Sequence, residues 1–434
     1  MIYYFIGIKG SGMSSLAQVM HDLGYKVMGS DKPDHFFTQD ELEKKGIEIV
    51  TFNKDNIKDN MIIVQGNAFN DDHEEVVRAK ELGLKIYTYQ SMIAELTNNT
   101  KLIAISGCHG KTTTTTMMSK VLENIGVNYL IGDGTGHADK KNEYFALEAC
   151  EFKRHFLSYS PYYAIITNVE LDHTDYYKDL DDVIDAFNSF ANSARHYVVL
   201  CGDDKNTPKL KINKPVFKYG FNESNDLYAK NIKIENDTTT VDIYVHNELY
   251  DTFTFPFVGD HLLLNVMAVI SVCYLEGIDK EEVKKQVLKI EHAKRRFIET
   301  KFQSNILIDD YAHHPTEVKV TIEAARKKYP DKFIVAIFKA HTKSRVKFFH
   351  KEFADALNLA DKSYVMEIGE DRKEVGYDDV THNDILKDTK NGEFISIETA
   401  DKLLQYKDSV LLFMSSKDIY FLEDKYKELA NKNS

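Results

Sequence analysis

An apolar strand pattern and a glycine turn meet in the stretch Ile103-Ala104-Ile105-Ser106-Gly107-Cys108-His109-Gly110-Lys111-Thr112-Thr113. The apolar run predicts a buried strand, and the turn is followed by a predicted helix whose apolar face runs from Met117 to Ile125. A strand, a glycine loop and a lysine at a helix start form the geometry that holds a triphosphate. In that geometry Lys111 neutralises the outer phosphates and the Thr112 hydroxyl can ligate Mg²⁺.

The loop has the shorter pattern G-x-x-G-K-T-T, because Ile105 stands where the general phosphate-loop motif has a glycine. Glycine-lysine-threonine also occurs in ordinary surface turns, so the tripeptide alone is weak evidence. The buried strand before it and the amphipathic helix after it favour the phosphate loop over a surface turn. The sequence therefore predicts a triphosphate-binding site at residues 107–113.

Composition narrows the class of protein. A chain of 434 residues is too long for one ordinary core and predicts two or three domains. Its net charge of −13 disfavours nucleic acid as the main partner, but it leaves room for an anionic small molecule. The four cysteines form no C-x-x-C pair, which favours free thiols in a reducing compartment. With no signal-peptide pattern and no apolar run of membrane-spanning length, we expect a cytoplasmic protein without a membrane segment.

A second glycine loop lies near the N-terminus. A short strand leads into Gly7-Ile8-Lys9-Gly10-Ser11-Gly12-Met13, and a helix and a strand ending in Gly29-Ser30-Asp31 follow. The order G-x-x-G-x-G differs from the dinucleotide fingerprint G-x-G-x-x-G, so a purely structural tight turn stays an alternative. Two successive α/β units with glycine loops suggest two phosphorylated ligands, which a plain dehydrogenase would not need.

Polar residues follow two predicted strands in the middle of the chain. Glu148 ends one strand, and the next delivers Asn168-Val169-Glu170-Leu171-Asp172-His173-Thr174-Asp175. Glu148 and His173 are candidate Mg²⁺ ligands, although histidine is an uncommon ligand for this ion and helix capping is the alternative for Asp172-His173. Between 228 and 258, apolar residues that include Ile232 and Ile234 alternate with polar ones, which predicts an antiparallel meander attached to a parallel sheet.

Charged side chains and histidines also gather at predicted strand ends in the last third. The basic group Lys294-Arg295-Arg296 precedes a strand that ends in Asp309-Asp310-Tyr311-Ala312-His313-His314-Pro315. A fully apolar strand then leads to His341-Thr342-Lys343-Ser344-Arg345. A basic run is usually a solvated surface, whereas two acids, a tyrosine and two histidines in so short a stretch are dense for a structural turn. We expect a third α/β unit with functional groups at its strand ends.

Taken in order, these motifs resemble the Mur ligase family over essentially the whole chain. The matching motifs are the Gly7 to Met13 loop, G-C-H-G-K-T-T, the Glu148 segment, T-N-V-E-L-D-H, Gly259-Asp260-His261 with Asn265, K-R-R-F, D-D-Y-A-H-H-P and H-T-K-S-R. The resemblance implies an α/β protein of three domains. These are an N-terminal Rossmann-like parallel-sheet domain for the UDP-sugar at 1–98, a central phosphate-loop ATPase-type domain with the meander at 99–297, and a mobile Rossmann-like domain at 298–434.

The resemblance also implies roles for individual residues. ATP would contact Gly107, His109, Gly110, Lys111, Thr112, Thr113, Asn265, Arg296 and Asp310. The UDP-sugar would contact Gly10, Ser11, Gly12, Met13, Ser30, Asp31 and Asn67, and Mg²⁺ would be held by Thr112, Glu148 and His173. The catalytic group would be Lys111, His173, Arg296, His314, His341 and Arg345. Of these, the last three would face the sugar-nucleotide and the incoming amino acid.

The activity implied is ATP-dependent joining of L-alanine to UDP-N-acetylmuramate, a step in peptidoglycan precursor synthesis. ATP would phosphorylate the carboxylate and the amine would attack the acyl phosphate, so we expect domain closure before phosphoryl transfer. Two alternatives stay open: a ligase that adds a preformed peptide to the same sugar-nucleotide, and a nucleotide-binding regulatory protein with impaired catalysis. The expected assembly is a monomer or a homodimer.

The chain departs from the family pattern in three places. It has Phe338-Lys339-Ala340-His341 where the family usually has F-Q-P-H, Ser415-Ser416-Lys417-Asp418 where it has G-A-G-D, and Leu262 where an Asn often follows His261. Loss of both glycines restricts the backbone angles that the second turn can adopt. The ATP end therefore matches the family better than the amino-acid end, and the preferred amino acid stays open.

Overall fold

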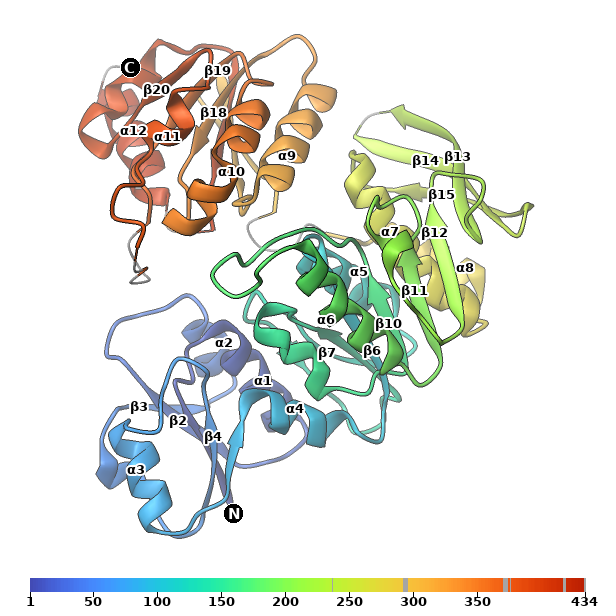
Figure 1. Cartoon of the computed structure of the whole chain (residues 1–434), viewed down its shortest axis with the longest axis vertical. Coiled ribbons are helices and arrows are strands. Elements are labelled where there is room, and N and C mark those ends of the chain that lie inside the picture. The colour runs from blue at the N-terminus through green and yellow to red at the C-terminus, as the bar shows by residue number, and fades with distance from the viewer. Residues whose placement is uncertain (236, 292–295, 370–373, 375, 417–418, 433–434) are drawn as a thin grey trace. The chain divides into compact units, whose positions relative to one another are not determined.

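The computed structural model describes residues 1–434 except 236, 292–295, 370–373, 375, 417–418 and 433–434. The chain divides into two compact units. Unit 1 comprises Met1–Glu170, Leu180–Pro256 and Leu262–Glu291, and unit 2 comprises Leu171–Asp179, Phe257–His261 and His292–Ser434. Unit 1 holds a five-stranded sheet and a ten-stranded sheet, and unit 2 holds a six-stranded sheet (Figure 1).

The N-terminal sheet is parallel throughout, in the order β3-β2-β1-β4-β5. Its strands are β1 (Ile2–Ile6), β2 (Val27–Asp31), β3 (Glu48–Thr51), β4 (Met61–Gln65) and β5 (Ile86–Thr88). The connecting helices are α1 (Ser11–Asp22), α2 (Gln39–Lys44), the 3₁₀ helix η1 (Lys54–Asn56), α3 (Glu74–Glu81) and α4 (Tyr89–Thr97). Tyr4, Phe5 and Ile6 are all fully buried, as expected for a parallel strand covered on both faces. The predicted parallel N-terminal sheet is confirmed.

The central sheet has the order β15-β14-β13-β12-β11-β10-β6-β9-β7-β8. Its strands are β6 (Lys101–Ser106), β7 (Val127–Leu130), β8 (Gly136–His137), β9 (Tyr144–Glu148), β10 (Tyr163–Ile166), β11 (Tyr197–Cys201), β12 (Val216–Gly220), β13 (Leu227–Glu235), β14 (Thr238–Val245) and β15 (Glu248–Phe255). Its helices are α5 (Lys111–Val121), η2 (Phe152–Ser158), α6 (Leu180–Asn192), η3 (Thr207–Lys209), α7 (Asp260–Leu275) and α8 (Lys280–Val287). Strand β6 lies between β10 and β9, all three parallel, so their carboxyl ends meet at one edge.

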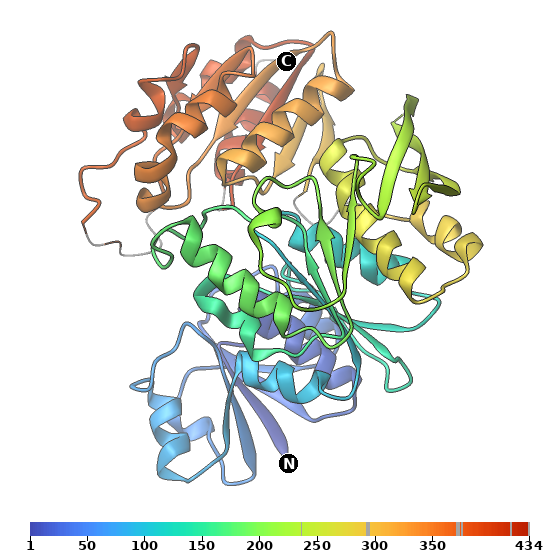
Figure 2. The same cartoon turned by 45° about the vertical axis from the view of Figure 1, so that its right-hand side comes forward.

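The predicted antiparallel meander is confirmed as β13, β14 and β15. Helix α8 lies beside it (Figure 2), and Lys284 Nζ is 2.9 Å from Asp251 Oδ1 of β15. Ile232 and Ile234 were expected on its apolar face, but both are exposed. The pairing register shifts between Lys230 and Lys233, and such a bulge reverses which alternate residues point inward.

The apolar face predicted for α5 is shorter than expected. The helix ends at Val121, and Gly126, with φ of +101°, donates its N–H to the Leu122 carbonyl. This glycine turn ends the helix before Ile125, which is exposed. The expectation that Ile125 belongs to the buried face is therefore wrong.

The C-terminal sheet has the order β16-β17-β21-β18-β19-β20 and is parallel except for β16. Its strands are β16 (Ile298–Phe302), β17 (Asn305–Asp310), β18 (Phe333–Phe338), β19 (Lys362–Val365), β20 (Gly392–Phe394) and β21 (Ser409–Met414). Its helices are α9 (Pro315–Lys328), α10 (Lys343–Leu357), α11 (Asn383–Leu386), η4 (Ile397–Gln405) and α12 (Tyr420–Lys432). Val410 and Leu412 pack in one hydrophobic cluster and Leu411 and Phe413 in another, so the continuous apolar run of β21 is buried on both faces.

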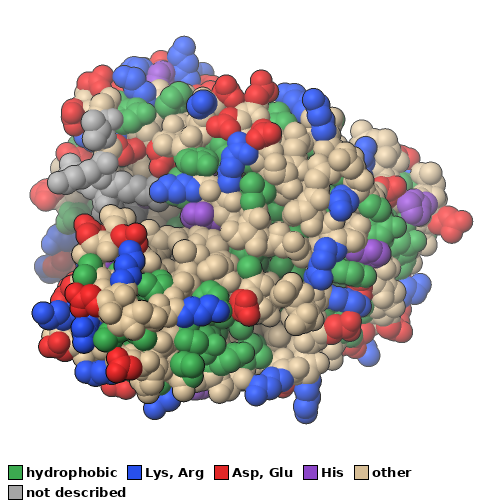
Figure 3. Space-filling view, turned by 60° about the horizontal axis from the view of Figure 1, so that its bottom comes forward, with side chains coloured by type: hydrophobic (Ala, Val, Ile, Leu, Met, Phe, Trp, Pro, Cys, Tyr) green, Lys and Arg blue, Asp and Glu red, His purple; other side chains and the backbone are tan. Residues whose placement is uncertain are grey.

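The surface carries charged side chains of both signs (Figure 3), as the composition leads one to expect. None of the helices in the described ranges has both the length and the apolar character needed to cross a bilayer. On the face shown in Figure 3, basic and acidic side chains are interspersed. All four cysteines are free thiols, as expected. The domain boundaries at 98/99 and 297/298 stay predictions.

Glu276, just after α7, ties together the amino ends of three central strands. Its carboxylate accepts hydrogen bonds from Lys101 Nζ at 2.9 Å, Tyr144 Oη at 2.6 Å and Tyr163 Oη at 2.7 Å. These donors are the first residues of β6, β9 and β10. Burial alone would raise the pKa of Glu276, but the three donors lower it overall. The charged carboxylate therefore holds the sheet edge opposite the phosphate loop.

Replacing Glu276 by Gln should lower the free energy of unfolding by about 1–3 kcal/mol, because a hydrogen-bonded charge is lost. A lowered pKa stabilises the fold above the ordinary pKa of the group, and the effect is lost as pH falls through the folded-state pKa. The difference between wild type and Glu276→Gln in urea unfolding should therefore shrink on acidification. Glu143→Gln is the control, because Glu143 pairs with the same Lys101 but is mostly exposed. Equal effects of the two substitutions would contradict the proposed role of Glu276 in joining the three strands.

Candidate active site

The phosphate loop connects β6 to α5 through two glycines in left-handed backbone conformations. Gly107 has φ of +140° and Gly110 has φ of +82°. A Cβ on Gly107 would lie 2.1 Å from Thr167 Oγ1, and a Cβ on Gly110 would lie 2.7 Å from Asn265 Oδ1. Both positions therefore require glycine for backbone angle and for space. Helix α5 begins directly after Gly110, and no side chain caps its N-terminus.

Residues after β10 hold the loop in shape. Asn168 Oδ1 accepts the His109 N–H at 2.9 Å, and Asn168 Nδ2 donates to the His109 carbonyl at 2.9 Å. The Thr167 hydroxyl donates to the same carbonyl at 2.6 Å. The register that pairs Ile166 with Ser106 brings these side chains to the loop. Both peptide groups of His109 are thereby fixed.

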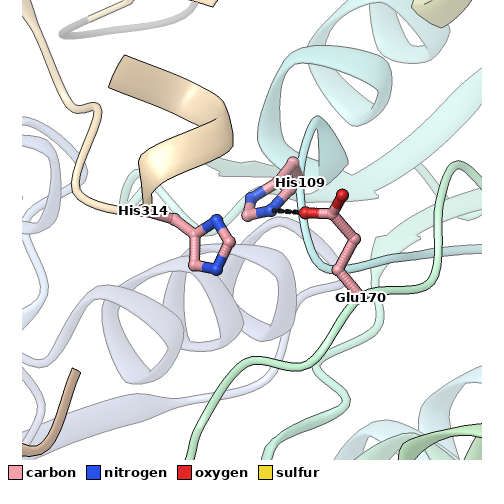
Figure 4. Close-up of side chains that lie close together, drawn as sticks. All are labelled: His109, Glu170 and His314. Carbon is pink, nitrogen blue, oxygen red and sulfur yellow. Dashed lines mark hydrogen bonds and ion pairs between the residues drawn. The ribbon is translucent and has the colours of Figure 1, made fainter. Parts of the chain in front are cut away.

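The His109 side chain is also held in place. Its Nε2 lies 3.1 Å from Glu170 Oε2, and the two side chains point toward one another in Figure 4. Cys108 Sγ donates to the Glu170 carbonyl at 3.0 Å, so both residues between the two glycines contact the strand-end segment. His109 was predicted to contact ATP, and the structure places it on the wall of the phosphate loop.

Lys111 lies at the first position of α5 with its side chain folded back over the loop. Its Nζ is 2.9 Å from Glu151 Oε2 and donates to the carbonyls of Gly107 and Cys108. Burial would lower the pKa of Lys111, but the Glu151 carboxylate raises it overall. The lysine is therefore a fixed cation at the phosphate loop. Glu151 was not among the predicted site residues. The sequence feature that could have indicated it is a second carboxylate three residues after Glu148.

Thr112 and Glu148 bring oxygen atoms together beside the loop. The Thr112 hydroxyl donates to Glu148 Oε1 at 3.1 Å, and the Gly132 N–H donates to Glu148 Oε2 at 2.8 Å. Strand pairing explains the placement, because Glu148 lies opposite Ile105 at the end of β9. A hydroxyl and a carboxylate are hard oxygen donors of the kind that Mg²⁺ prefers, so these two residues fit the predicted metal.

Two more predicted ATP contacts lie in the same part of unit 1. Thr113 is buried in the first turn of α5. Asn265 is buried on α7, and its amide faces Gly110. The sequence alone could not distinguish Asn265 from a solvated helix residue, because only the fold brings α7 to the loop.

The N-terminal glycine loop resembles the phosphate loop, because it also leads into a helix start that no side chain caps. Gly10 precedes α1, and no side chain caps the N-terminus formed by Ser11, Gly12 and Met13. Asp31 Oδ2 accepts the Lys9 N–H at 2.7 Å, and the Ser30 hydroxyl donates to Glu75 Oε2 at 2.5 Å. Of these two predicted UDP-sugar contacts, Asp31 thus also shapes the loop, whereas the Ser30 hydroxyl contacts helix α3. The remaining one, Asn67, is exposed just after β4.

In unit 2, the predicted ATP contacts Asp310 and Arg296 are neighbours. Asp310 is buried at the end of β17 and accepts the N–H groups of Phe297 and Ala312, each at 2.8 Å. Burial raises the pKa of Asp310 to about 6, and Arg296 partly offsets the shift. The Arg296 guanidinium lies 4.9 Å from the ring centroid of Tyr311. Lys294 and Arg295, which precede it in the basic group, lie outside the described residues.

Glu317 connects two further predicted site residues. Its Oε1 lies 3.4 Å from Arg296 Nη1, and its Oε2 accepts the His314 N–H at 3.2 Å. The His314 side chain, also labelled in Figure 4, caps α9 by accepting the Thr316 N–H. Glu317 was not predicted, and its signal was a carboxylate at the third position of a helix, as in a capping box.

Arg345 and His173 are linked through Asp172 in unit 2. Arg345 Nη2 donates to Asp172 Oδ1 at 2.5 Å and Nε does so at 3.1 Å, with both side chains buried. The same oxygen accepts the His173 N–H at 2.6 Å, and His173 has φ of +50°. His341 follows β18, and its ring centroid lies 6.1 Å from that of His313.

Residues 339–340 and 415–416, where the sequence departs from the family pattern, lie side by side. Phe338 of β18 pairs with Met414 of β21, and the Ser415 hydroxyl donates to the Lys339 carbonyl at 2.9 Å. Ala340 and Ser415 are both buried. Lys417 and Asp418 lie outside the described residues.

Comparisons with known proteins identify the class and then the family. Three sheets with a phosphate loop on the central one define an ATP-dependent enzyme built from α/β domains. Residues 2–101 match the Mur ligase family catalytic domain, 105–273 the Mur ligase middle domain, and 295–416 the Mur ligase glutamate ligase domain. The chain belongs to the Mur ligase family.

Solved structures show the same three-domain fold. The chain is 25% identical to UDP-N-acetylmuramate–alanine ligase MurC from Thermotoga maritima, with a TM-score of 0.81 and 100% of both chains covered. It is 23% identical to a murein peptide ligase from Psychrobacter arcticus, with a TM-score of 0.72 and 99% of both chains covered. It also resembles the MurF ligase of Thermotoga maritima in complex with ADP, at 19% identity and a TM-score of 0.67, over 88% of this chain and 97% of that one. The predicted three-domain fold class is confirmed.

Gly107→Ala should weaken nucleotide binding by about tenfold or more, because its Cβ would meet Thr167 and deform the loop. The measurement is the Kd of a non-hydrolysable ATP analogue by calorimetry. Gly83→Ala is the matched control, because Gly83 also has positive φ but has no atom within 4 Å of its added Cβ. Gly83→Ala should cost some stability and leave the Kd unchanged. Unchanged binding by Gly107→Ala would contradict the role of this loop.

Asp310 should make the stability of unit 2 pH-dependent. A carboxyl group whose folded pKa is raised to about 6 stabilises the fold below its ordinary pKa, and this effect is lost as pH rises through about 6. Relative to Asp310→Asn, the wild type should therefore lose about 2–3 kcal/mol of unfolding free energy between pH 4 and pH 7. Thermal unfolding across this range measures it, with exposed Asp331→Asn as control. A constant difference between wild type and Asp310→Asn would refute the assignment.

Proposed function

We propose that this chain joins L-alanine to UDP-N-acetylmuramate with hydrolysis of ATP. The observation that carries the proposal is a pair of helix N-termini in unit 1, at α1 and α5, that follow glycine loops and have no side-chain cap. Uncapped N-termini attract phosphate groups, because their free N–H groups and the helix dipole favour negative charge. A sugar-nucleotide and ATP supply phosphates for both. The 25% identity to MurC over the whole chain supports the same pair of substrates.

ATP would bind at residues 107–113. The phosphates would be surrounded by Gly107, His109, Gly110, Thr112 and Thr113. The Lys111 ammonium group would turn partly away from Glu151 and neutralise the outer phosphates. Thr112 and Glu148, with His173, would hold Mg²⁺, which would neutralise charge that builds up on the transferring phosphoryl group. Asn265, Arg296 and Asp310 would contact the rest of the nucleotide.

The sugar-nucleotide would bind in the domain at 1–98. Its phosphates would lie at Gly10, Ser11, Gly12 and Met13, and Ser30, Asp31 and Asn67 would complete the site. The domain at 99–297 would bind ATP, and the domain at 298–434 would supply His314, His341 and Arg345 on the side of the amino acid. Arg345 would keep its orientation through Asp172.

The chemistry follows from the poor reactivity of a carboxylate toward an amine. One oxygen of the carboxylate of UDP-N-acetylmuramate attacks the γ-phosphorus of ATP, and ADP leaves, which yields an acyl phosphate. The amine of alanine then attacks the acyl carbon, a proton leaves the nitrogen, and inorganic phosphate departs as the amide forms. Lys111, Arg296 and Arg345 act by holding the negatively charged reactants together. Exclusion of water protects the acyl phosphate from hydrolysis.

A second candidate is a ligase that transfers a preformed peptide to the same sugar-nucleotide. The likeness to a murein peptide ligase over 99% of both chains favours this candidate. The neighbouring departures at 339–340 and 415–416 also fall at the end of the chain where the acceptor is expected. The two candidates share every ATP-binding residue and differ only in the acceptor.

The deciding experiment measures phosphate release and product mass with ATP, Mg²⁺ and UDP-N-acetylmuramate. L-alanine and a tripeptide are offered separately. Release that requires alanine supports the proposal, and release that requires the tripeptide supports the second candidate. Binding of both nucleotides without turnover on either acceptor identifies the regulatory protein instead.

Lys111→Met should lower kcat by at least about a hundredfold, because the cation that faces the transferred phosphoryl group is lost. Lys120→Met, at the other end of the same helix, should keep kcat within about twofold, because Lys120 pairs with nearby Glu123 near the surface. Initial rates of phosphate release provide the measurement. Full activity of Lys111→Met would exclude the proposed role of the phosphate loop.

A further inference from the structure

Tyr89 lies beside both glycine loops of unit 1. It is the first residue of α4, and Thr88 caps this helix by accepting the Ser91 N–H. A Cβ added to Gly12 would lie 2.8 Å from both Cζ and Oη of Tyr89, so the phenol packs directly on the backbone at the start of α1. A side chain at position 12 would therefore displace the Tyr89 phenol. This contact places the phenol hydroxyl at the uncapped N-terminus of α1.

The Tyr89 phenol also lies near residues at and after the end of β9 in the central sheet. Burial raises the pKa of Tyr89 well above its ordinary value, and the nearby Tyr159, Glu148 and Cys150 raise it further. The phenol is therefore neutral and keeps its proton, so its hydroxyl is a hydrogen-bond donor. Tyr89 thus lies between the N-terminal glycine loop and the carboxylate that fits the metal.

The hydroxyl is available to a ligand. Within the described part of the chain, no hydrogen bond to Tyr89 Oη is found, and the residue as a whole is half-buried. The groups next to it are the Gly12 backbone and the start of α1, which no side chain caps. The free N–H groups of this helix start and the phenol O–H are all hydrogen-bond donors, and such a group of donors suits an anion.

We propose that Tyr89 is a further sugar-nucleotide-binding residue, whose hydroxyl donates a hydrogen bond to the diphosphate seated at the N-terminus of α1. This inference rests on the proposed function, because it takes the ligand of that loop to be a nucleoside diphosphate sugar. It adds a contact from a strand end that none of the glycine-loop motifs includes. It also gives a physical reason why the loop has glycine at position 12.

The test compares ligands with and without phosphates. The Kd of UDP is measured by calorimetry, and the Kd of uridine by ligand-observed NMR, for wild type, Tyr89→Phe and Tyr87→Phe. Tyr89→Phe should raise the Kd of UDP by about tenfold or more, the loss expected for one hydrogen bond to a charged group, and leave the Kd of uridine unchanged. Tyr87→Phe, two residues away on β5, removes a hydroxyl that contacts Lys85 and should leave both unchanged.

Turnover gives a second readout. Tyr89→Phe should raise the KM for UDP-N-acetylmuramate and leave the KM for ATP unchanged, because the ring and the phosphate loop stay in place. An unchanged melting temperature and an unchanged Kd for an ATP analogue show that the variant is folded.

Three other results would each contradict a different part of the proposal. Wild-type affinity of Tyr89→Phe for UDP would refute the Tyr89 contact and leave the proposed function standing. An equal loss for uridine and UDP would refute the diphosphate as the partner of the hydroxyl. Failure of the wild-type protein to bind UDP would instead refute the proposed sugar-nucleotide substrate, and the Tyr89 contact with it.

Discussion

The whole central site depends on the absence of side chains at positions 107 and 110. Thr167 and Asn265 occupy the space that a Cβ would need, and they lie just after β10 and on α7, far along the chain. Glycine at both positions therefore lets the loop turn sharply into the start of α5 and pack closely against these two neighbours. The position of Lys111 over the loop and of Thr112 beside Glu148 follows from where that helix starts. A local motif thus acquires its geometry from long-range packing.

Buried ion pairs then set the electrostatics of each unit. Lys111 with Glu151 and Arg345 with Asp172 are both shielded from solvent. Removing such charges from water is costly, and the partner carboxylate offsets much of that cost only when the geometry is close. In both pairs the cation lies in the first turn of a helix, where the dipole disfavours positive charge. An anionic partner is therefore required at each place.

Patterns with a strong local signal could be predicted from the sequence. The parallel N-terminal sheet, the meander and the apolar strands of the third sheet are long apolar or alternating runs bounded by turns, and all are confirmed. The edge strands β3, β16 and β20 are short and mix polar with apolar residues, so periodicity could not reveal them. Ile125 and Ile234 were misjudged because a glycine turn and a bulge interrupt the periodicity that placed them.

The same distinction holds for the site. Lys111, Thr112 and Glu148 could be singled out from the sequence, because a motif and a strand end fix their positions. Glu151, Glu317 and Tyr89 could not be singled out, because their importance depends on partners that only the folded chain brings close.

The hydrogen bond from Ser415 to the Lys339 carbonyl joins two turns that follow neighbouring strands. The acceptor is a main-chain oxygen, so any residue at position 339 can provide it, whereas the donor requires a hydroxyl at position 415. The link between the two turns is therefore encoded at one position only. A glycine at 415 would remove the link whatever residue occupies 339.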